Sequence, residues 1–69
     1  MIKKGKYRHF KGNEYEVIDI AEHTESGEIL VIYKGLYGDG KVWARPAVMW
    51  DEEVLYEGER VKRFAYIGE

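Results

Sequence analysis

Residues 31–46 have the sequence VIYKGLYGDGKVWARP, and this stretch decides the fold. On either side of Gly38-Asp39-Gly40, a sequence typical of tight turns, the chain is rich in β-branched and aromatic residues. We therefore predict a β-hairpin in which these three residues form the loop and Gly35 faces Trp43 across the strands. The Trp43 indole would then cover the bare glycine, an arrangement that suits a glycine within a strand.

A second hairpin precedes this one and shares one of its strands. Thr24 to Gly27 suit a four-residue loop whose last residue, a glycine, adopts the left-handed conformation. Such a loop would pair Ile20 with Val31 and Ile18 with Tyr33. All four side chains would then share one face of the sheet.

The central strands are apolar on both faces. The opposite face would carry Val17, Leu30, Ile32, Leu36 and Val42. Because a flat sheet of this length cannot cover both faces, we expect a mainly β fold: a small SH3-like bent barrel of five to six short antiparallel strands, with a β-bulge at Val17-Ile18.

The strands are expected at Tyr7–Phe10, Tyr15–His23, Glu28–Tyr37, Lys41–Arg45, Val54–Tyr56 and Arg60–Ile67. Proline suits the start of a helix, so Pro46–Asp51 is expected to form one short helical turn that plugs an end of the barrel.

The composition fits a single small domain spanning residues 1–69. The apolar fraction is 45%, and the chain includes two Trp, six Tyr and two Phe, which is too apolar for a disordered segment. Without cysteine the chain can form neither a disulfide nor a thiolate zinc site. Its stability is therefore expected to come from aromatic packing, from dimerisation, or from both.

Charge and hydropathy narrow the classes of partner. The net charge of −2 argues weakly against nucleic acid, whose binding normally needs a basic surface. Residues 1–11 carry five positive charges and no acid, residues 12–33 carry six acids and no base, and residues 46–59 carry five acids and no base. Such alternating blocks favour cross-strand pairing over a basic binding arm.

The sequence contains no targeting or membrane segment that we recognise. No apolar segment follows the first lysines and no run approaches the ~18 apolar residues of a membrane span, so we expect a cytoplasmic protein.

Several segments of the chain resemble one family. They are Tyr7 to Val17, Ala21 to Ser26, Val31 to Tyr33, Leu36 to Asp39, Trp43 to Pro46 and Met49-Trp50. With its LYGD turn followed by a W-x-R-P strand end, the chain resembles, from about Gly5 to Phe64, a bacterial family catalogued as domain of unknown function 1653. The resemblance implies no reaction. Trp50 stands where phenylalanine is more usual in that family, and the exchange keeps the position apolar.

No recognisable catalytic or metal-binding motif is found in the sequence. His9 and His23 are the only histidines, and no Asp or Glu stands at a diagnostic ligand spacing, so we predict a partly buried, hydrogen-bonded His9 and a His23 that ends a strand beside a turn. Gly38-Asp39-Gly40 lacks the ending of a phosphate loop, and Asp51-Glu52-Glu53 is interpreted as a solvated turn. We predict no catalytic residue, metal or cofactor. A third hypothesis is an enzyme in which a histidine is the general base and Arg45 an anion clamp.

Arg45 is the charged residue that we single out for ligand recognition. It precedes Pro46 at the end of an expected strand, and the predicted register places it opposite Tyr33. An arginine held beside aromatic rings presents a planar group suited to a carboxylate or a phosphate. The alternative is that Arg45 pairs internally with an acid such as Asp39 or Glu53.

Large aromatic side chains allow two interpretations. Tyr33, Tyr37, Trp43 and Trp50 could form a ligand platform, or they could be the core, since large rings bury the most area in so short a chain. We expect Trp43 to be mostly buried, and Tyr37 or Tyr7 to be more exposed.

The first functional hypothesis is a non-enzymatic binding module for an anionic or aromatic small ligand or a peptide. Its ligand-binding residues would be Tyr7, His9, Tyr37, Trp43 and Arg45. The alternative is an interaction protein whose apolar sheet face forms a homodimer or docks on a larger cytoplasmic partner.

Overall fold

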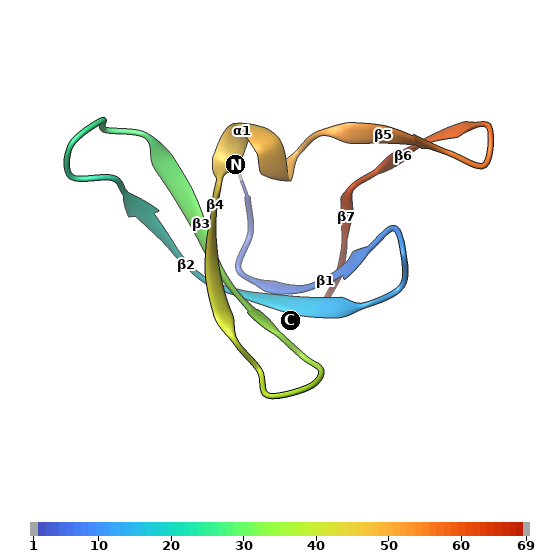
Figure 1. Cartoon of the computed structure of the whole chain (residues 1–69), viewed down its shortest axis with the longest axis horizontal. Helices are drawn as coiled ribbons and strands as arrows, with labels where there is room; N and C mark the ends of the chain where they lie inside the picture. Colours follow the sequence, from blue (N-terminus) through green and yellow to red (C-terminus); the bar gives the residue numbers. More distant parts are fainter. Residues whose placement is uncertain (1, 69) are drawn as a thin grey trace.

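A computed structural model describes residues 2–68 of the chain (Figure 1). Its elements in chain order are β1 (Gly5–His9), β2 (Glu14–Glu22), β3 (Ile29–Gly35), β4 (Val42–Pro46), α1 (Ala47–Trp50), β5 (Glu53–Tyr56), β6 (Glu59–Lys62) and β7 (Phe64–Gly68). The mainly β class, with antiparallel strands and one short helical turn, is confirmed. Within residues 2–68 there is no helix of the length and hydropathy needed to cross a membrane.

Seven strands are present instead of the expected five or six. The run Arg60–Ile67, expected as one strand, divides at Arg63 into β6, which pairs with β5, and β7, which pairs with β1. At the division the Arg63 N–H donates to the Glu52 carbonyl (2.9 Å), and the Arg63 carbonyl accepts from the Phe10 N–H (3.0 Å). Both backbone groups stay hydrogen-bonded, so the chain can change partners without leaving either one unsatisfied.

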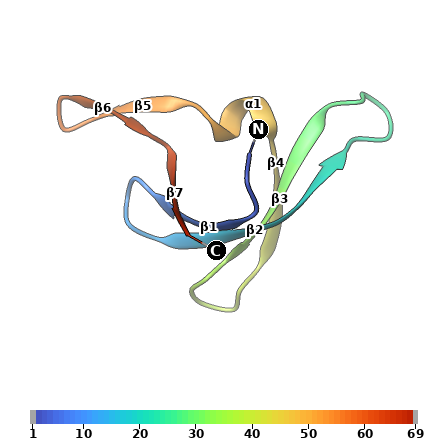
Figure 2. The same ribbon diagram turned by 180° about the vertical axis from the view of Figure 1, so that it is seen from behind.

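The main sheet bends strongly but does not close. Its five strands follow the order β4-β3-β2-β1-β7, and β5 and β6 form a separate hairpin. Figures 1 and 2 show the sheet curving around a concave side, with α1 at its rim and the β5–β6 hairpin projecting away. Among residues 2–68, the edge strands β4 and β7 do not pair with each other, so the expected barrel is open. We call the concave side the inner face; it carries Tyr7, His9, Tyr15, Val17, Val31, Tyr33, Gly35, Trp43, Arg45 and Phe64.

A β-bulge sets which residues of β2 face inward. The four-residue loop is confirmed, because the His23 N–H donates to the Glu28 carbonyl (2.8 Å), and Ile20 pairs with Val31 as expected. Between Val17 and Asp19 the register shifts by one residue, which confirms the bulge.

The predicted pairing beyond the bulge is wrong. Val17, not Ile18, faces Tyr33, because one extra residue reverses the face of every residue beyond it. Val17 is consequently buried, with 1% of its surface exposed, and Ile18 is 40% exposed on the outer face.

The β3–β4 hairpin has a longer loop than the expected one. The Gly35 N–H donates to the Lys41 carbonyl (3.0 Å), so the connection comprises Leu36 to Gly40 and not only Gly38 to Gly40. Gly38 and Gly40 both have positive φ angles, 59° and 65°, which glycine adopts without steric cost.

This loop shifts the strand register by two residues. Tyr33 faces Trp43 and Val31 faces Arg45, so the predicted pairs Gly35–Trp43 and Tyr33–Arg45 are wrong. A shift of two keeps every side chain on its expected face. The contact between the indole and Gly35 is confirmed, since a Cβ added at Gly35 would lie 3.2 Å from Trp43 Cζ3.

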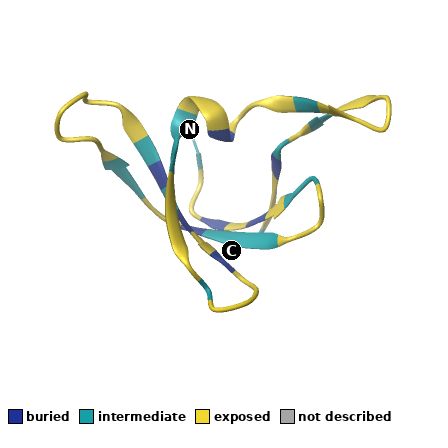
Figure 3. Cartoon of the chain, in the orientation of Figure 1, coloured by how far each residue is buried: buried dark blue, intermediate teal, exposed yellow. Residues whose placement is uncertain are grey.

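Trp50, and not Trp43, is the central residue of the core. Trp50 closes α1, is 1% exposed, and stacks on Phe64 with ring centroids 3.8 Å apart. Its ring also lies 4.9 Å from that of Tyr33 and 5.3 Å from that of Tyr7. The six buried core residues are Tyr7, Val17, Val31, Tyr33, Trp50 and Phe64, and Figure 3 shows in dark blue that buried positions lie on several strands and at the end of α1.

The expected burial of Trp43 is wrong, and of the two tyrosines expected to be more exposed, Tyr37 is exposed and Tyr7 is not. Trp43 is 38% exposed, because β4 is an edge strand, and Trp50 is the tryptophan of the core. Tyr7 is buried because its strand, β1, is flanked on both sides by β2 and β7.

Charged residues pair with one another on the outer face of β1 and β2. Arg8 pairs with Glu14 (2.9 Å) and Lys4 with Asp19 (3.8 Å), so the basic and acidic blocks meet across β1 and β2 as expected. All four side chains are exposed, and such pairs typically contribute less than about 1 kcal/mol. The stability of the fold must therefore come from the aromatic core.

Candidate functional site

An exposed aromatic group lies at the β4 side of the inner face. Tyr15 meets the rings of Tyr37 (5.5 Å) and Trp43 (6.1 Å) in edge-to-face contacts. The hydroxyls of Tyr15 and Tyr37 are hydrogen-bonded at 3.0 Å. Tyr37 is 44% exposed, as predicted, and with Trp43 it presents ring surface to solvent. We call Tyr15, Tyr37 and Trp43 the aromatic platform.

Tyr15 is the member of the platform that the sequence reasoning missed. It faces Gly35 across β2 and β3, and the missing side chain of this glycine leaves room for the rings around it. Burial, and then the hydrogen bond with Tyr37, raise the pKa of Tyr15 to about 12. Its hydroxyl therefore stays protonated and anchors Tyr37 near neutral pH.

Arg45 lies on the same face as the platform. Its guanidinium carbon is 5.7 Å from the centre of the Phe64 ring, and the side chain is half-buried. Among residues 2–68 it forms no ion pair, and Glu53 instead pairs with Arg60 (3.4 Å). The alternative of an internal pair with Asp39 or Glu53 is therefore wrong, and β5 carries Glu53 on the hairpin that projects from the main sheet.

His9 lies within reach of the charges of Arg45, Lys11 and Arg63, and we call this region the positively charged corner. Its ring contacts Phe64 (5.1 Å) and lies 6.4 Å from the ring of Tyr15. Its Nδ1 accepts a hydrogen bond from the Lys11 N–H (3.1 Å), so the predicted partly buried, hydrogen-bonded ring is confirmed. Burial lowers the pKa of His9 below its ordinary value of 6.5, and the charges of Arg63, Lys11 and Arg45 lower it further. A negatively charged group near this corner would be attracted.

We expect His9 to make the stability of the fold depend on pH. A histidine whose pKa is lowered on folding stabilises the folded state above its unfolded pKa, and this contribution is lost as the pH falls through the folded pKa. The free energy of unfolding should therefore fall between about pH 7 and about pH 5, and it should fall less in His9→Gln. Chemical denaturation of both proteins at the two pH values measures the difference. An equal fall in both would contradict the lowered pKa.

The remaining predicted site residue lies apart from solvent. Tyr7 belongs to the core, and its hydroxyl donates to the Lys3 carbonyl (2.8 Å). Of the five predicted residues, the inner face therefore presents His9, Tyr37, Trp43 and Arg45 around Tyr15 and Phe64, whereas the Tyr7 ring packs against Trp50 in the core. His23 directly follows the end of β2 and lies beside a turn, as expected, and its Nδ1 accepts a hydrogen bond from the Glu25 N–H (3.1 Å).

A second hollow lies between β1, β7 and the β5–β6 hairpin. It has a volume of about 260 Å³ and is lined by Arg8, His9, Phe10, Tyr56, Val61, Lys62, Ala65 and Ile67. The Phe10 and Tyr56 rings meet edge to face at 5.2 Å. Two of the lining residues, Arg8 and Lys62, are positively charged at any physiological pH and none is an acid, so this hollow is a competing location for an anion.

No metal site is indicated by the described residues. Within 2–68, no three His, Asp or Glu side chains gather in a way that could hold a metal ion.

Comparisons with known proteins extend over almost the whole chain. A family described as "Protein of unknown function (DUF1653)" matches residues 5–66. A crystal structure of a DUF1653 protein from Bordetella bronchiseptica is similar to this chain, with 33% sequence identity, a TM-score of 0.90, and coverage of 97% of this chain and 88% of that one. No curated protein matches. Since neither description names an activity or a ligand, the function has to be argued from the inner face itself.

Proposed function

We propose that this chain, which belongs to the DUF1653 family of proteins of unknown function, is a non-enzymatic binding module for a small ligand carrying an aromatic ring and an anionic group. The observation that carries the proposal is the exposed indole of Trp43 on the same face as Arg45, a guanidinium without an acid partner among residues 2–68.

The aromatic platform supplies the surface for the ring. Rings prefer edge-to-face or offset contacts, and Tyr15 already holds Tyr37 and Trp43 in such contacts without help from a ligand. A platform that is ordered in advance loses little side-chain entropy when a ligand binds. The hydrogen bond between Tyr15 and Tyr37 adds to this order.

Arg45 supplies the recognition of charge. Its guanidinium can donate two parallel hydrogen bonds to a carboxylate or a phosphate. The charge of Lys11, which acts on His9 together with that of Arg45, has the same sign and strengthens the attraction, whereas Arg63 adds less because it pairs with Glu52 (3.5 Å). A bound anion would offset these charges, so it should also raise the pKa of His9.

Calorimetric titration with phenyl phosphate at low salt tests the proposal. We expect saturable binding that weakens by about tenfold or more in Trp43→Leu, which removes the indole, and in Arg45→Gln, which removes the charge. Arg60→Gln is the matched control. It also removes one positive charge, but from an exposed position on β6, and it should leave the affinity unchanged. Benzylamine, which has the ring but the opposite charge, should not bind.

Two results would count against this function. One is the absence of saturable binding of phenyl phosphate. The other is an equal loss of affinity in Arg60→Gln and Arg45→Gln, which would indicate a response to net charge alone.

A second candidate function rests on the outer face of β3 and β4. Val42 is 54% exposed there, and the neighbouring Leu30, Ile32 and Leu36 extend an apolar surface. Such a surface suits a homodimer or a larger partner. Sedimentation at increasing concentration should then show a rise in mass that Val42→Asp abolishes. A constant mass equal to that of one chain would remove the homodimer.

A further inference from the structure

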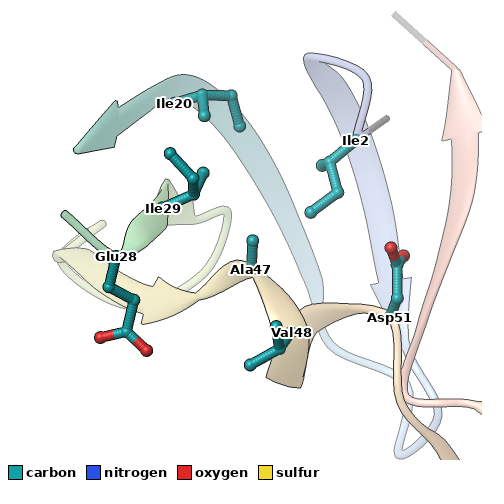
Figure 4. A pocket seen from close by; sticks show the side chains of 7 residues that line it. All are labelled: Ile2, Ile20, Glu28, Ile29, Ala47, Val48 and Asp51. Carbon is teal, nitrogen blue, oxygen red and sulfur yellow. The ribbon is translucent and has the colours of Figure 1, made fainter.

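An almost purely apolar groove lies at the end of the inner face opposite the aromatic platform. It has a volume of about 720 Å³ and is lined by Ile2, Ile20, Glu28, Ile29, Ala47, Val48 and Asp51 (Figure 4). These residues come from the segment before β1, from β2, from the start of β3 and the residue before it, and from α1 and the residue after it. None of them belongs to the aromatic platform or to the corner around His9.

The apolar lining is open to solvent. Val48 is 77% exposed at the first turn of α1, and Ile29 is 45% exposed at the start of β3. Leaving these side chains in water forgoes the free energy that burying them would supply, roughly 25 cal/mol per Å². The volume also lies within the range of about 300 to 1,000 Å³ typical of binding clefts.

The two charged residues of the groove have the same sign and stand at its ends. Figure 4 shows Glu28 at one end, beside Ile29, and Asp51 at the other, beyond Val48. Among residues 2–68, the carboxylates of Glu28 and Asp51 form no ion pair, although five other acidic side chains do. An occupant that brought a positive charge to each end would complement both.

We propose that this groove docks a protein segment in which one or two aliphatic side chains are flanked on each side by a lysine or an arginine. The aliphatic side chains enter between Ile20, Ile29 and Val48, and the flanking cations meet Glu28 and Asp51. Fatty acids and other anionic amphiphiles fit poorly, because their charged group would face a carboxylate at either end. Charge complementarity with the rim is what separates this occupant from any other apolar one.

Selection from a displayed library of random seven-residue peptides tests the proposal with the full chain as bait. We expect enrichment of peptides with an aliphatic centre and Lys or Arg on both sides, at the expense of acidic peptides. A synthetic peptide made from the enriched sequence should bind about tenfold or more weakly to Val48→Asp, which places a charge on the apolar wall. Leu55→Asp is the matched control, since it places the same charge at an apolar side chain of nearly equal exposure, 76%, outside the groove and should retain binding.

Charge reversal distinguishes the role of the rim. In the double variant Glu28→Lys with Asp51→Lys, the same selection should enrich acidic flanks in place of basic ones. No enrichment with the unmodified chain, enrichment without a charge preference, or equal binding by Val48→Asp and Leu55→Asp would each overturn the proposal. Self-association that only Val48→Asp abolishes would overturn it as well, because a second copy would then be the occupant.

Discussion

Replacing Val17 by aspartate should unfold the protein. Val17 is 1% exposed and lies on the inner face opposite Tyr33, so the new carboxylate would be buried without a partner. An uncompensated buried charge costs on the order of 3 to 5 kcal/mol, which is comparable with the whole stability that a core of this size supplies. Circular dichroism and denaturant titration should show little or no folded protein at room temperature.

The neighbouring residue provides the control for this expectation. Ile18→Asp introduces the same charge one position along the chain, where the bulge turns the side chain to the outer face at 40% exposure. Its free energy of unfolding should differ from that of the unmodified chain by less than about 1 kcal/mol. If Ile18→Asp unfolded the protein and Val17→Asp did not, the bulge would be absent and the register of β2 would be the uninterrupted one.

The second large effect is expected for Trp50→Ala. The indole stacks on Phe64 and contacts the rings of Tyr7 and Tyr33, so its removal leaves a cavity at the centre of the core. Loss of a buried tryptophan costs about 3 to 5 kcal/mol, enough to unfold a domain without disulfides. Thermal melting followed by circular dichroism measures this loss.

Trp43→Ala is the matched substitution, because it removes the same side chain from an exposed position. With 38% of its surface in solvent, Trp43 should contribute clearly less, about 1 to 2 kcal/mol. Comparable losses in the two variants would contradict the division of roles in which Trp50 is core and Trp43 belongs to the platform.

Local patterns predicted the hairpins and their inner and outer faces. The loop after β2 and the pairing of Ile20 with Val31 follow from turn residues and alternation within a few positions. The β3–β4 register was wrong by two residues because the loop also takes in Leu36 and Tyr37, which have the composition of strand residues. Since an error of two preserves the face, Trp43 and Arg45 still lie on the face that was expected.

Contacts between distant segments could not be predicted in the same way. Two tryptophans were available to fill the core, and the choice of Trp50 depends on α1 bringing it back over Phe64 of the last strand. Tyr15 escaped notice because its role depends on facing Gly35 and on the ring of Tyr37 beyond the strand. The break at Arg63 depends on two separate pairing partners, which no local pattern encodes.

The position of a bound ligand tests the central claim most directly. Crystals of the protein soaked with phenyl phosphate should show the ring against Trp43 and Tyr37, and the phosphate oxygens within hydrogen-bond distance of the Arg45 guanidinium, about 2.7 to 2.9 Å. The same arrangement should be absent in crystals of Arg45→Gln. Phenyl phosphate seated instead in the hollow beside Tyr56 and Lys62, or no bound molecule at an inner face open to solvent, would contradict the account.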